Sequence, residues 1–312
     1  MSTARARPFR FGIQLATPLP GLSWADTARQ VESLGFSTLF IPDHFGDQLA
    51  PISALSVAAA VTTELKVGAL VFDNDYRHPV TLAKEMATLD VLSDGRVELG
   101  LGAGWMKTDY EQSGIAYDRP GIRIDRMIEA ISVIRGCHAA GPFDFSGEHY
   151  EITGYDAQPL PVGPMPLLLG GGGPRMLKYC AQEAEIVGIN ANMKAGEIGP
   201  DAVLDLAAES IDRKLEWVRN AAGDRFAEIE LSMMAMTTPT DDRDGTISGI
   251  AELFGAERSL IEETPILLIG STSSMIEDLQ ARRERWQLSY IVVSNCTELD
   301  AISPVISELA GR

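Results

Sequence analysis

The sequence predicts one α/β domain, a (β/α)8 TIM barrel, from three observations. Short apolar runs alternate with amphipathic helical patterns along the whole chain of 312 residues, as expected for parallel strands covered by helices. Eight of these runs are each followed by a helical pattern. The first run leads into a Pro-containing loop, FGIQLATPLPG, and lacks the glycine fingerprint of the rival doubly wound sheet.

The candidate strands are short and apolar, and several of the helices after them have clear end signals. Ser23 is placed as the N-cap of the first helix and Gly35 just after its last turn, while Pro79 opens the third helix and Gly95 closes it. The strands are expected at residues 9–15, 37–42, 65–71, 96–102, 166–170, 185–190, 228–236 and 289–294.

Two segments are too long for ordinary barrel loops. Residues 138–165, after the fourth helix, form a Gly/Pro/aromatic stretch, and residues 237–288, between the seventh and eighth strands, include an apolar run, ILLIGS, that could form a ninth strand. We interpret both as insertions in a single domain spanning residues 9–312, because no linker-like composition divides the chain. Residues 1–8 are expected to form a flexible N-terminus.

The charge balance excludes several classes of partner. Lys plus Arg number 26 against 44 Asp plus Glu, and the formal net charge of −18 repels nucleic-acid backbones and anionic lipid. Apolar stretches fall far short of the roughly 20 residues that span a bilayer. Cys137, Cys180 and Cys296 are widely separated and are expected to be buried thiols. We therefore expect a cytoplasmic protein that binds neither nucleic acid nor membrane.

Alternation in two strands places polar groups inside the barrel. In the fourth strand Val97, Leu99 and Leu101 are expected to face the helices, while Glu98 points inward, as does Gln14 of the first strand. A buried carboxylate needs a partner. We expect Gln14 or an inward arginine to hold Glu98, with a functional acid as the alternative.

An acid and an imidazole stand together after the second strand. Asp43 and His44 follow STLFIP, at the barrel end where active sites lie, so we predict a catalytic or ligand-binding role. Capping of the next helix is the alternative for His44. His78 precedes Pro79 and is expected to shape the start of the third helix.

Two glycine-rich turns follow strands, after the fourth (Gly102-Ala103-Gly104-Trp105) and after the fifth (Gly170 to Gly173, then Pro174 and Arg175). Glycine lets backbone approach a flat ligand, and a helix N-terminus offers N–H groups to a phosphate. Arg175 and Lys178 add positive charge there. Each turn alone also fits an ordinary βα connection; together they indicate a planar cofactor that carries phosphate. No metal-ligand spacing is present, so no metal is expected. The GxSxG motif of serine hydrolases and the paired carboxylates of glycosidases are also absent, which disfavours those two enzyme classes.

Together these motifs resemble the bacterial luciferase-like superfamily, above all its branch that uses coenzyme F420, a 5-deazaflavin. The resemblance is carried by STLFIPDHF, by LKVGALVFDNDYRHP, SDGR and GLGAGW, and by PLLLGGGGPRMLKYCAQEAEIVGIN. It runs from about Phe9 to Asn190 and returns at PILLIGSTSSMIEDLQ and YIVVS. It implies a barrel with a deazaflavin or flavin across the carboxyl ends of its strands.

The resemblance also implies which residues contact the cofactor. In this family the third strand usually ends in a bulge with a non-prolyl cis peptide, and the match falls within Ala69, Leu70 and Val71, at the Leu70-Val71 bond. The other matches are Asp43 and His44 beside the ring, Asn74, the Ala103-Gly104 turn, and a phosphate cradle formed by Gly170, Gly171, Gly172, Gly173, Pro174 and Arg175.

One departure from the family bears on the substrate. Its sugar-phosphate dehydrogenases carry a glutamate general acid after the glycines of strand four, where this chain has Trp105. That disfavours glucose-6-phosphate oxidation by the same mechanism. Trp105, Met106 and Met193 suggest an apolar substrate pocket, although methionine on barrel strands often only fills the core.

The resulting prediction is hydride transfer between the deazaflavin C5 and an apolar or conjugated small molecule, with His44, oriented by Asp43, as hydrogen-bond donor or proton carrier. An FMN-dependent luciferase-like monooxygenase shares nearly every motif and is the first alternative. A non-enzymatic barrel that only stores a flavin or deazaflavin is the second. The resemblance further implies a homodimer.

Overall fold

The computed structural model describes residues 7–294, 296 and 299–312. Within them eight parallel strands pair in a closed circle, each with the next and the last with the first. This confirms the predicted TIM barrel. In order around the circle the strands are β1 (Arg10–Gln14), β2 (Thr38–Ile41), β3 (Lys66–Ala69), β5 (Val97–Gly102), β8 (Leu167–Gly171), β9 (Ile186–Ile189), β10 (Glu230–Pro239) and β12 (Leu288–Ser294).

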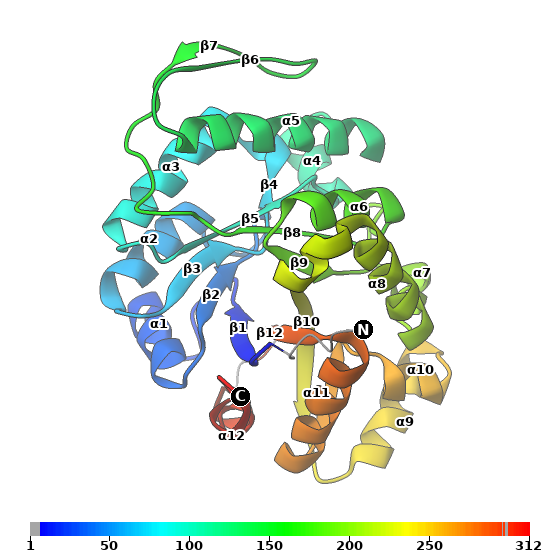
Figure 1. The fold of residues 1–312 in the computed structure, drawn as a ribbon. Helices are drawn as coiled ribbons and strands as arrows, with labels where there is room; N and C mark the ends of the chain where they lie inside the picture. Colours follow the sequence, from blue (N-terminus) through cyan, green and yellow to red (C-terminus); the bar gives the residue numbers. More distant parts are fainter. Residues whose placement is uncertain (1–6, 295, 297–298) are drawn as a thin grey trace.

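Helices ring the barrel, as Figure 1 shows. Their end signals are those read from the sequence: Ser23 accepts a hydrogen bond from the Asp26 N–H, Pro79 lies in the first turn of its helix, and His78 caps that helix by accepting from Val80. The helices are α1 (Trp24–Ser33), α2 (Pro51–Val61), α3 (Pro79–Leu92), α4 (Lys107–Ser113), α5 (Pro120–His138), α6 (Pro174–Glu183), α7 (Pro200–Leu204), α8 (Ala208–Ala222), α11 (Thr272–Trp286) and α12 (Leu299–Leu309), with short 3₁₀ turns at Asn74–Tyr76 and Gly223–Glu228.

Apolar side chains of the barrel form two layers, and a small third cluster lies in the second insertion among Ile247, Ala251, Ile261 and Ile269. Val97, Leu99 and Leu101 belong to the large core between strands and helices, as predicted. The inward-facing set is smaller and fills the barrel itself; it consists of Phe40, Leu168, Ile186, Tyr290 and Val292. The interior is therefore packed, and ligand chemistry belongs at a barrel end.

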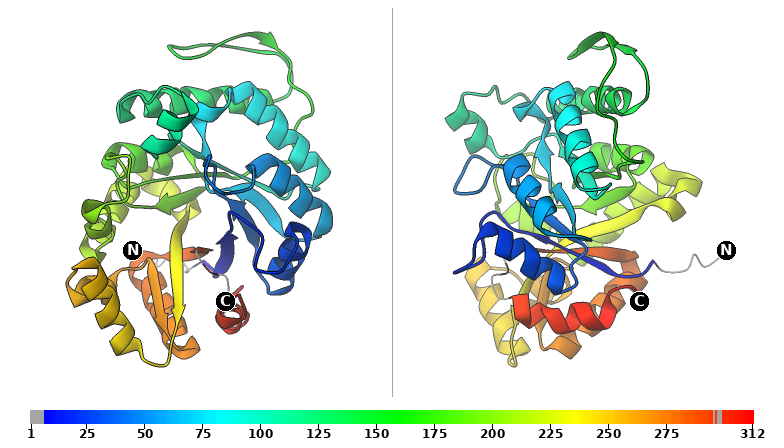
Figure 2. Two further views of the ribbon diagram at one scale, coloured as in Figure 1. Left: turned by 180° about the vertical axis from the view of Figure 1, so that it is seen from behind. Right: turned by 90° about the vertical axis from the view of Figure 1, so that its left-hand side faces the viewer.

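The two predicted insertions differ in form. Residues 138–165 contain an antiparallel hairpin, β6 (Phe143–Ser146) and β7 (Glu151–Tyr155), which lies outside the helical ring beyond α5 in both views of Figure 2. The second insertion holds α9 (Arg243–Phe254), α10 (Arg258–Glu263) and the anticipated ninth strand, β11 (Leu267–Gly270). This strand pairs in parallel with the last four residues of β10.

The chain start and the cysteines are placed as follows. Of the predicted flexible segment, residues 1–6 lie outside the described residues, and Arg7 donates to the carbonyl of Ala227 at 3.2 Å. Cys137, Cys180 and Cys296 are buried and none forms a disulfide. Across the described ranges, no helix combines the length and apolar character needed to cross a membrane.

Glu98 is fully buried inside the barrel, and an arginine holds it. Its carboxylate accepts from Arg10 at 2.5 Å, from Lys66 at 3.2 Å and from the Tyr290 hydroxyl at 3.0 Å. The expectation of an inward arginine is confirmed. Gln14 instead donates to the carbonyl of Leu70.

Candidate active site

His44 and Asp109 meet at the carboxyl end of the barrel. His44 follows β2, and Asp109 lies in the first turn of α4, after β5. His44 Nδ1 is 2.6 Å from Asp109 Oδ2, and Asp109 is 5% exposed. A carboxylate at this distance accepts the Nδ1 proton and fixes the ring orientation, which leaves Nε2 for an outside partner. The cap of α2 is Ala50, so the alternative reading of His44 as a helix cap is wrong.

Asp43 does not orient His44, contrary to the sequence-based expectation. Its carboxylate forms a bidentate ion pair with the Arg77 guanidinium, in which Nη2 lies 2.9 Å from Oδ1. It also accepts a hydrogen bond from the backbone N–H of Asp73 at 3.0 Å. The physical reason is burial: Asp43 is 6% exposed and needs a cation and donors of its own. Asp43 therefore anchors the segment that runs from β4 (Phe72–Asp73) into α3.

Aromatic rings surround the His44–Asp109 pair. Trp105 meets the His44 ring edge to face, with centroids 5.6 Å apart. Tyr76 donates its hydroxyl to Asp109 Oδ2 at 3.2 Å, and burial raises the pKa of this phenol. Phe45 is half exposed, and its ring packs against that of Tyr76 with the centroids 4.4 Å apart. Sequence reasoning missed Asp109, Tyr76 and Phe45.

A buried carboxyl group lies beneath the Ala103-Gly104 turn. At Gly104, where φ is +74°, a Cβ atom would sit 1.8 Å from the Tyr110 hydroxyl and 2.5 Å from Asp73 Oδ2, so only glycine fits. Burial raises the pKa of Asp73 to about 7. The Tyr110 hydroxyl lies 3.0–3.1 Å from both Asp73 oxygens and 3.0 Å from Asp75 Oδ2. The predicted cofactor turn thus rests on a polar network.

The third strand ends as the resemblance implied. A cis peptide joins Leu70 to Val71, which confirms the predicted bond, and Gln14 Nε2 donates to the Leu70 carbonyl at 2.6 Å. A Cβ atom on Gly102 would lie 2.5 Å from Val71 Cγ2. Glycine at position 102 therefore leaves the space that the Val71 side chain occupies at the barrel mouth. Ala69 is the last residue of β3.

Asn74 is also at this end of the barrel, 2% exposed. Its amide donates to the Tyr150 hydroxyl at 3.3 Å, so it ties the segment after β4 to the hairpin turn just before β7. Contact between Asn74 and a cofactor stays a prediction.

The predicted phosphate cradle joins β8 to α6. A Cβ atom on Gly172 would lie 2.2–2.4 Å from backbone atoms of Ala191 and Asn192, so the loop after β9 presses against the cradle. Gly173 caps α6 without a side chain, which leaves the first-turn N–H groups to an outside acceptor. The Arg175 guanidinium forms an ion pair with Asp125 of α5, so its charge is already matched.

Two loops bring the predicted pocket residues into one region. The Lys107 N–H donates to the Gly196 carbonyl at 3.1 Å, which docks the loop after β9 onto the loop that holds Trp105 and Met106. Met193 starts the turn closed by the Gly196 N–H at 3.0 Å. All three predicted pocket residues are partly exposed.

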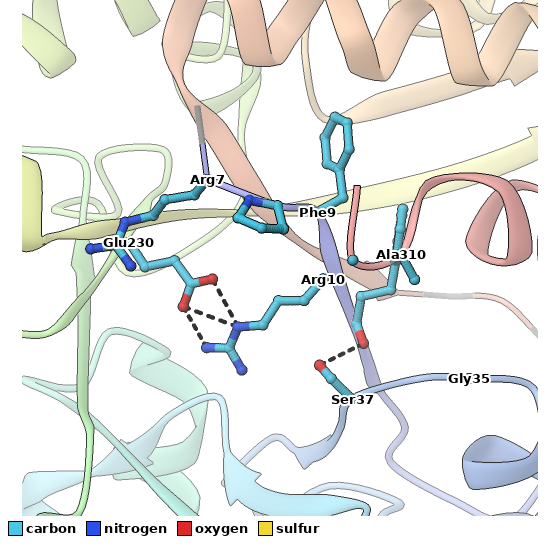
Figure 3. A pocket seen from close by; sticks show the side chains of 10 residues that line it. Arg7, Phe9, Arg10, Gly35, Ser37, Glu230 and Ala310 are labelled. Carbon is cyan, nitrogen blue, oxygen red and sulfur yellow. Dashed lines mark hydrogen bonds and ion pairs between the residues drawn. The ribbon is translucent and has the colours of Figure 1, made fainter. Parts of the chain in front are cut away.

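A pocket of about 420 Å³ lies at the opposite end of the barrel, among the amino ends of β1, β2 and β10 (Figure 3). There Arg10 is paired with Glu230 at 2.6 Å, and Ser37 donates to the Phe11 carbonyl at 2.9 Å. These groups have their partners within the protein, and no predicted site residue lines the pocket. In the described part of the chain, no group of three His, Cys, Asp or Glu side chains is arranged to hold a metal ion.

The chain was compared with known proteins and structures. It is 29% identical over 231 residues to a 5,10-methylenetetrahydromethanopterin reductase of Archaeoglobus fulgidus, which covers 68% of each chain. It is 27% identical over 213 residues to an F420-dependent glucose-6-phosphate dehydrogenase of Amycolatopsis mediterranei, which covers 66% of this chain and 63% of that protein.

Two solved structures share the fold over nearly their whole length. The coenzyme F420 dependent tetrahydromethanopterin reductase from Methanopyrus kandleri superposes with a TM-score of 0.78 at 19% identity, covering 97% of this chain and 98% of that one. The oxygenating constituent of 3,6-diketocamphane monooxygenase from Pseudomonas putida, in complex with FMN, gives 0.73 at 16% identity, covering 98% and 99%. The profile of luciferase-like monooxygenases matches residues 9–246, most of the sequence. The protein is therefore an enzyme that belongs to the luciferase-like monooxygenase family.

Proposed function

We propose that the protein is an oxidoreductase that binds coenzyme F420 across the carboxyl ends of its barrel strands and acts on an apolar or conjugated small molecule. Two of the relatives described above are named as F420-dependent, one by sequence and one by structure. One structural neighbour described above is in complex with FMN, so the choice of cofactor rests on the site and on experiment.

The residues of the cradle fit a phosphate group. Gly172 and Gly173 present bare backbone, and the first turn of α6 carries N–H donors with no capping side chain. Asn192 adds an amide whose Nδ2 lies 3.4 Å from the position of a Cβ on Gly173. This donor set suits a single phosphate and is independent of the Arg175 charge.

The observation that carries the proposal is the His44–Asp109 pair. When bound, the deazaflavin would supply hydride donation or acceptance at C5. Asp109 holds His44 through Nδ1 and Tyr76 holds Asp109, so the imidazole presents Nε2 at the mouth in a fixed orientation. From there His44 donates a hydrogen bond or moves a proton at Nε2, while Trp105 packs against the His44 ring and Phe45 against Tyr76.

An FMN-dependent monooxygenase is the second candidate. The structural likeness to the FMN-bound oxygenase and the family profile favour it. The cradle suits FMN as well, because FMN also carries one phosphate.

A binding titration separates the two candidates. Purified protein is titrated with F420 and, separately, with FMN, and the change in cofactor fluorescence gives each dissociation constant. Tight F420 binding with weak FMN binding is expected. The reverse preference would assign the monooxygenase, with oxygen consumption as the next assay, and binding of neither would reject both candidates.

We also propose that the protein is a cytoplasmic homodimer. The family resemblance supports the dimer, and sedimentation at the mass of one chain, 33.7 kDa, would contradict it. The buried thiols support a reducing compartment: burial raises the pKa of Cys137 to about 11, which keeps it protonated and inert. Fractionation of the native host would test the location.

A further inference from the structure

A fully buried lysine lies behind the phosphate cradle. Lys214, in α8, has no exposed side-chain area. Its ammonium group donates to the Asn190 carbonyl at 2.8 Å, the Asp205 carbonyl at 2.7 Å and Asp205 Oδ2 at 2.7 Å. All three ammonium protons are therefore used to join the end of β9 to the end of α7.

Asp205 carries this connection on to the loop after β9. Its carboxylate accepts the backbone N–H of Asn192 and the hydroxyl of Ser210, each at 2.8 Å, in addition to Lys214. Burial would raise the pKa of Asp205, but the hydrogen bonds from Lys214, Ser210 and Asn192 lower it, so the carboxylate stays charged. One ion pair, with Lys214 fully buried and Asp205 partly exposed, thus holds both Asn190 and Asn192.

The loop held in this way forms one wall of the cradle. The carbonyl carbon of Ala191 and the nitrogen of Asn192 lie only 2.2 Å and 2.3 Å from where a Cβ on Gly172 would be. Side-chain donors follow the same wall: Asn190 Nδ2 lies 2.9 Å from the Cβ position of Gly170, and Asn192 Nδ2 lies beside Gly173. A shift of this loop would move the cradle and its amide donors together.

We propose that Asp205 and Lys214 are positioning residues for recognition of the cofactor's phosphate, and that Asn192 is a direct phosphate donor. This inference rests on the proposed function, because it takes the cradle to hold the phosphate of F420 or FMN. Asp205 and Lys214 never touch the phosphate; they fix the backbone against which Gly172 and Gly173 pack. The interaction with the isoalloxazine or deazaflavin ring is formed elsewhere, at the barrel mouth, and does not depend on them.

The test compares ligands with and without phosphate. Dissociation constants for FMN and riboflavin, and for F420 and the deazaflavin riboside without phosphate, are measured by fluorescence on the purified full chain. The dissociation constant of the ligand without phosphate, divided by that of the ligand with phosphate, reports the phosphate contribution for FMN and riboflavin. For F420 the same ratio also includes the acidic tail attached to its phosphate, so the flavin pair is decisive. In Lys214→Met and in Asp205→Asn this ratio should fall about tenfold or more, the scale of a lost hydrogen bond to a charged group, while riboflavin affinity changes less than about twofold. Asn192→Ala should lower the same ratio.

A matched control separates positioning from general destabilisation. Arg96 also donates to several carbonyls, those of Ala59, Leu65 and Ser93, but at the amino end of the barrel. Arg96→Met should lower the melting temperature and keep the wild-type ratio. If Lys214→Met fails to fold, Asp205→Asn, which keeps the side-chain shape, decides the matter.

The outcomes are distinct. An unchanged ratio in folded Lys214→Met and Asp205→Asn overturns the inference and leaves the proposed function intact. A wild-type ratio near one overturns it too, because the cradle would then not recognise phosphate. If the wild type binds none of the four ligands, the proposed function itself fails.

Discussion

His44 and Asp109 are 65 positions apart in the sequence, and their side chains meet at 2.6 Å. Each follows a different barrel strand, so the closure of the sheet brings them together. Tyr76 adds a hydrogen bond to the same carboxylate oxygen from a third segment. An imidazole held in this way has one defined free nitrogen, which is what proton transfer at a fixed position requires.

Replacement of Asp109 should therefore affect turnover more than binding. Asp109→Asn is expected to lower turnover by about 10²-fold, the scale for losing a positioned acid or base, with F420 affinity nearly unchanged. His44→Ala should have a similar effect. The assay is oxidation of reduced F420 by a panel of reducible apolar acceptors.

The double variant checks that the pair acts as a unit. Asp109→Asn introduced into His44→Ala should cost almost nothing further, since groups that act together are strongly non-additive. A full second loss of rate would show that Asp109 acts without His44.

The fold could be predicted because most barrel strands and helices carry signals within their own few residues. Capping at Ser23, the first-turn proline at Pro79 and the alternation around Glu98 are all properties of a few consecutive residues. The hairpin at 143–155 could not be predicted in this way, because only one of its strands, β6, alternates in burial and neither buries a continuous apolar face.

The candidate site was only partly predictable, because its pairings are long-range. Asp43 and His44 are adjacent in the sequence, which suggested a contact between their side chains. Asp43 is buried and needs a cation, however, and it pairs with Arg77 instead. Asp109, in the first turn of α4, is not among the predicted site residues. The available signal was its place just after the glycine turn of a barrel strand, where side chains from other strands converge.

The buried Asp73 should impose a distinct pH dependence on stability. Burial raises its pKa to about 7, whereas an unfolded Asp titrates near about 3.9. Above that lower value the unfolded chain loses the proton and the folded protein keeps it. The stability contributed by Asp73 is therefore complete below about pH 4 and is lost as the pH rises to about 7.

Asp73→Asn isolates this effect, because an amide resembles the protonated acid and can serve Tyr110 and the Asp75 N–H. The free energy of unfolding of the variant, relative to wild type, should rise between pH 5 and pH 7 by about 1.4 kcal/mol per pH unit. Urea unfolding at several pH values measures it. Other carboxylates contribute equally to both proteins, so parallel curves would mean that Asp73 is ionised throughout.

Salt should speed the association of F420. The protein carries a formal charge of −18, and two of the cations on the segments that follow β5 and β8 are paired: Arg175 with Asp125, and Lys107 with Glu111 at 3.0 Å. Repulsion of the polyanionic cofactor should then dominate. Raising ionic strength from about 0.01 M to about 0.15 M shortens the screening length from about 30 Å to about 8 Å, so the association rate should increase.

Stopped-flow fluorescence measures this rate, with uncharged riboflavin as the control ligand whose rate should be insensitive to salt. A rate that falls with salt would reveal an attractive patch, and the cations that create it would then belong to the binding site.

Glu98 should matter for stability and not for cofactor binding. It is fully buried with Arg10, Lys66 and Tyr290 around it, at the barrel end opposite His44. Glu98→Ala leaves the Tyr290 hydroxyl without its acceptor and the partly buried Arg10 guanidinium with one partner fewer. Removing one member of a buried pair costs about 3–5 kcal/mol of stability.

Lys66→Met is the matched control for Glu98→Ala. The Lys66 side chain is 42% exposed, and exposed pairs contribute about 1 kcal/mol or less. Urea unfolding should rank the two variants in that order while both retain wild-type F420 affinity. Equal losses would show that Glu230 alone satisfies Arg10, and a loss of F420 affinity in a folded Glu98→Ala would couple the two ends of the barrel.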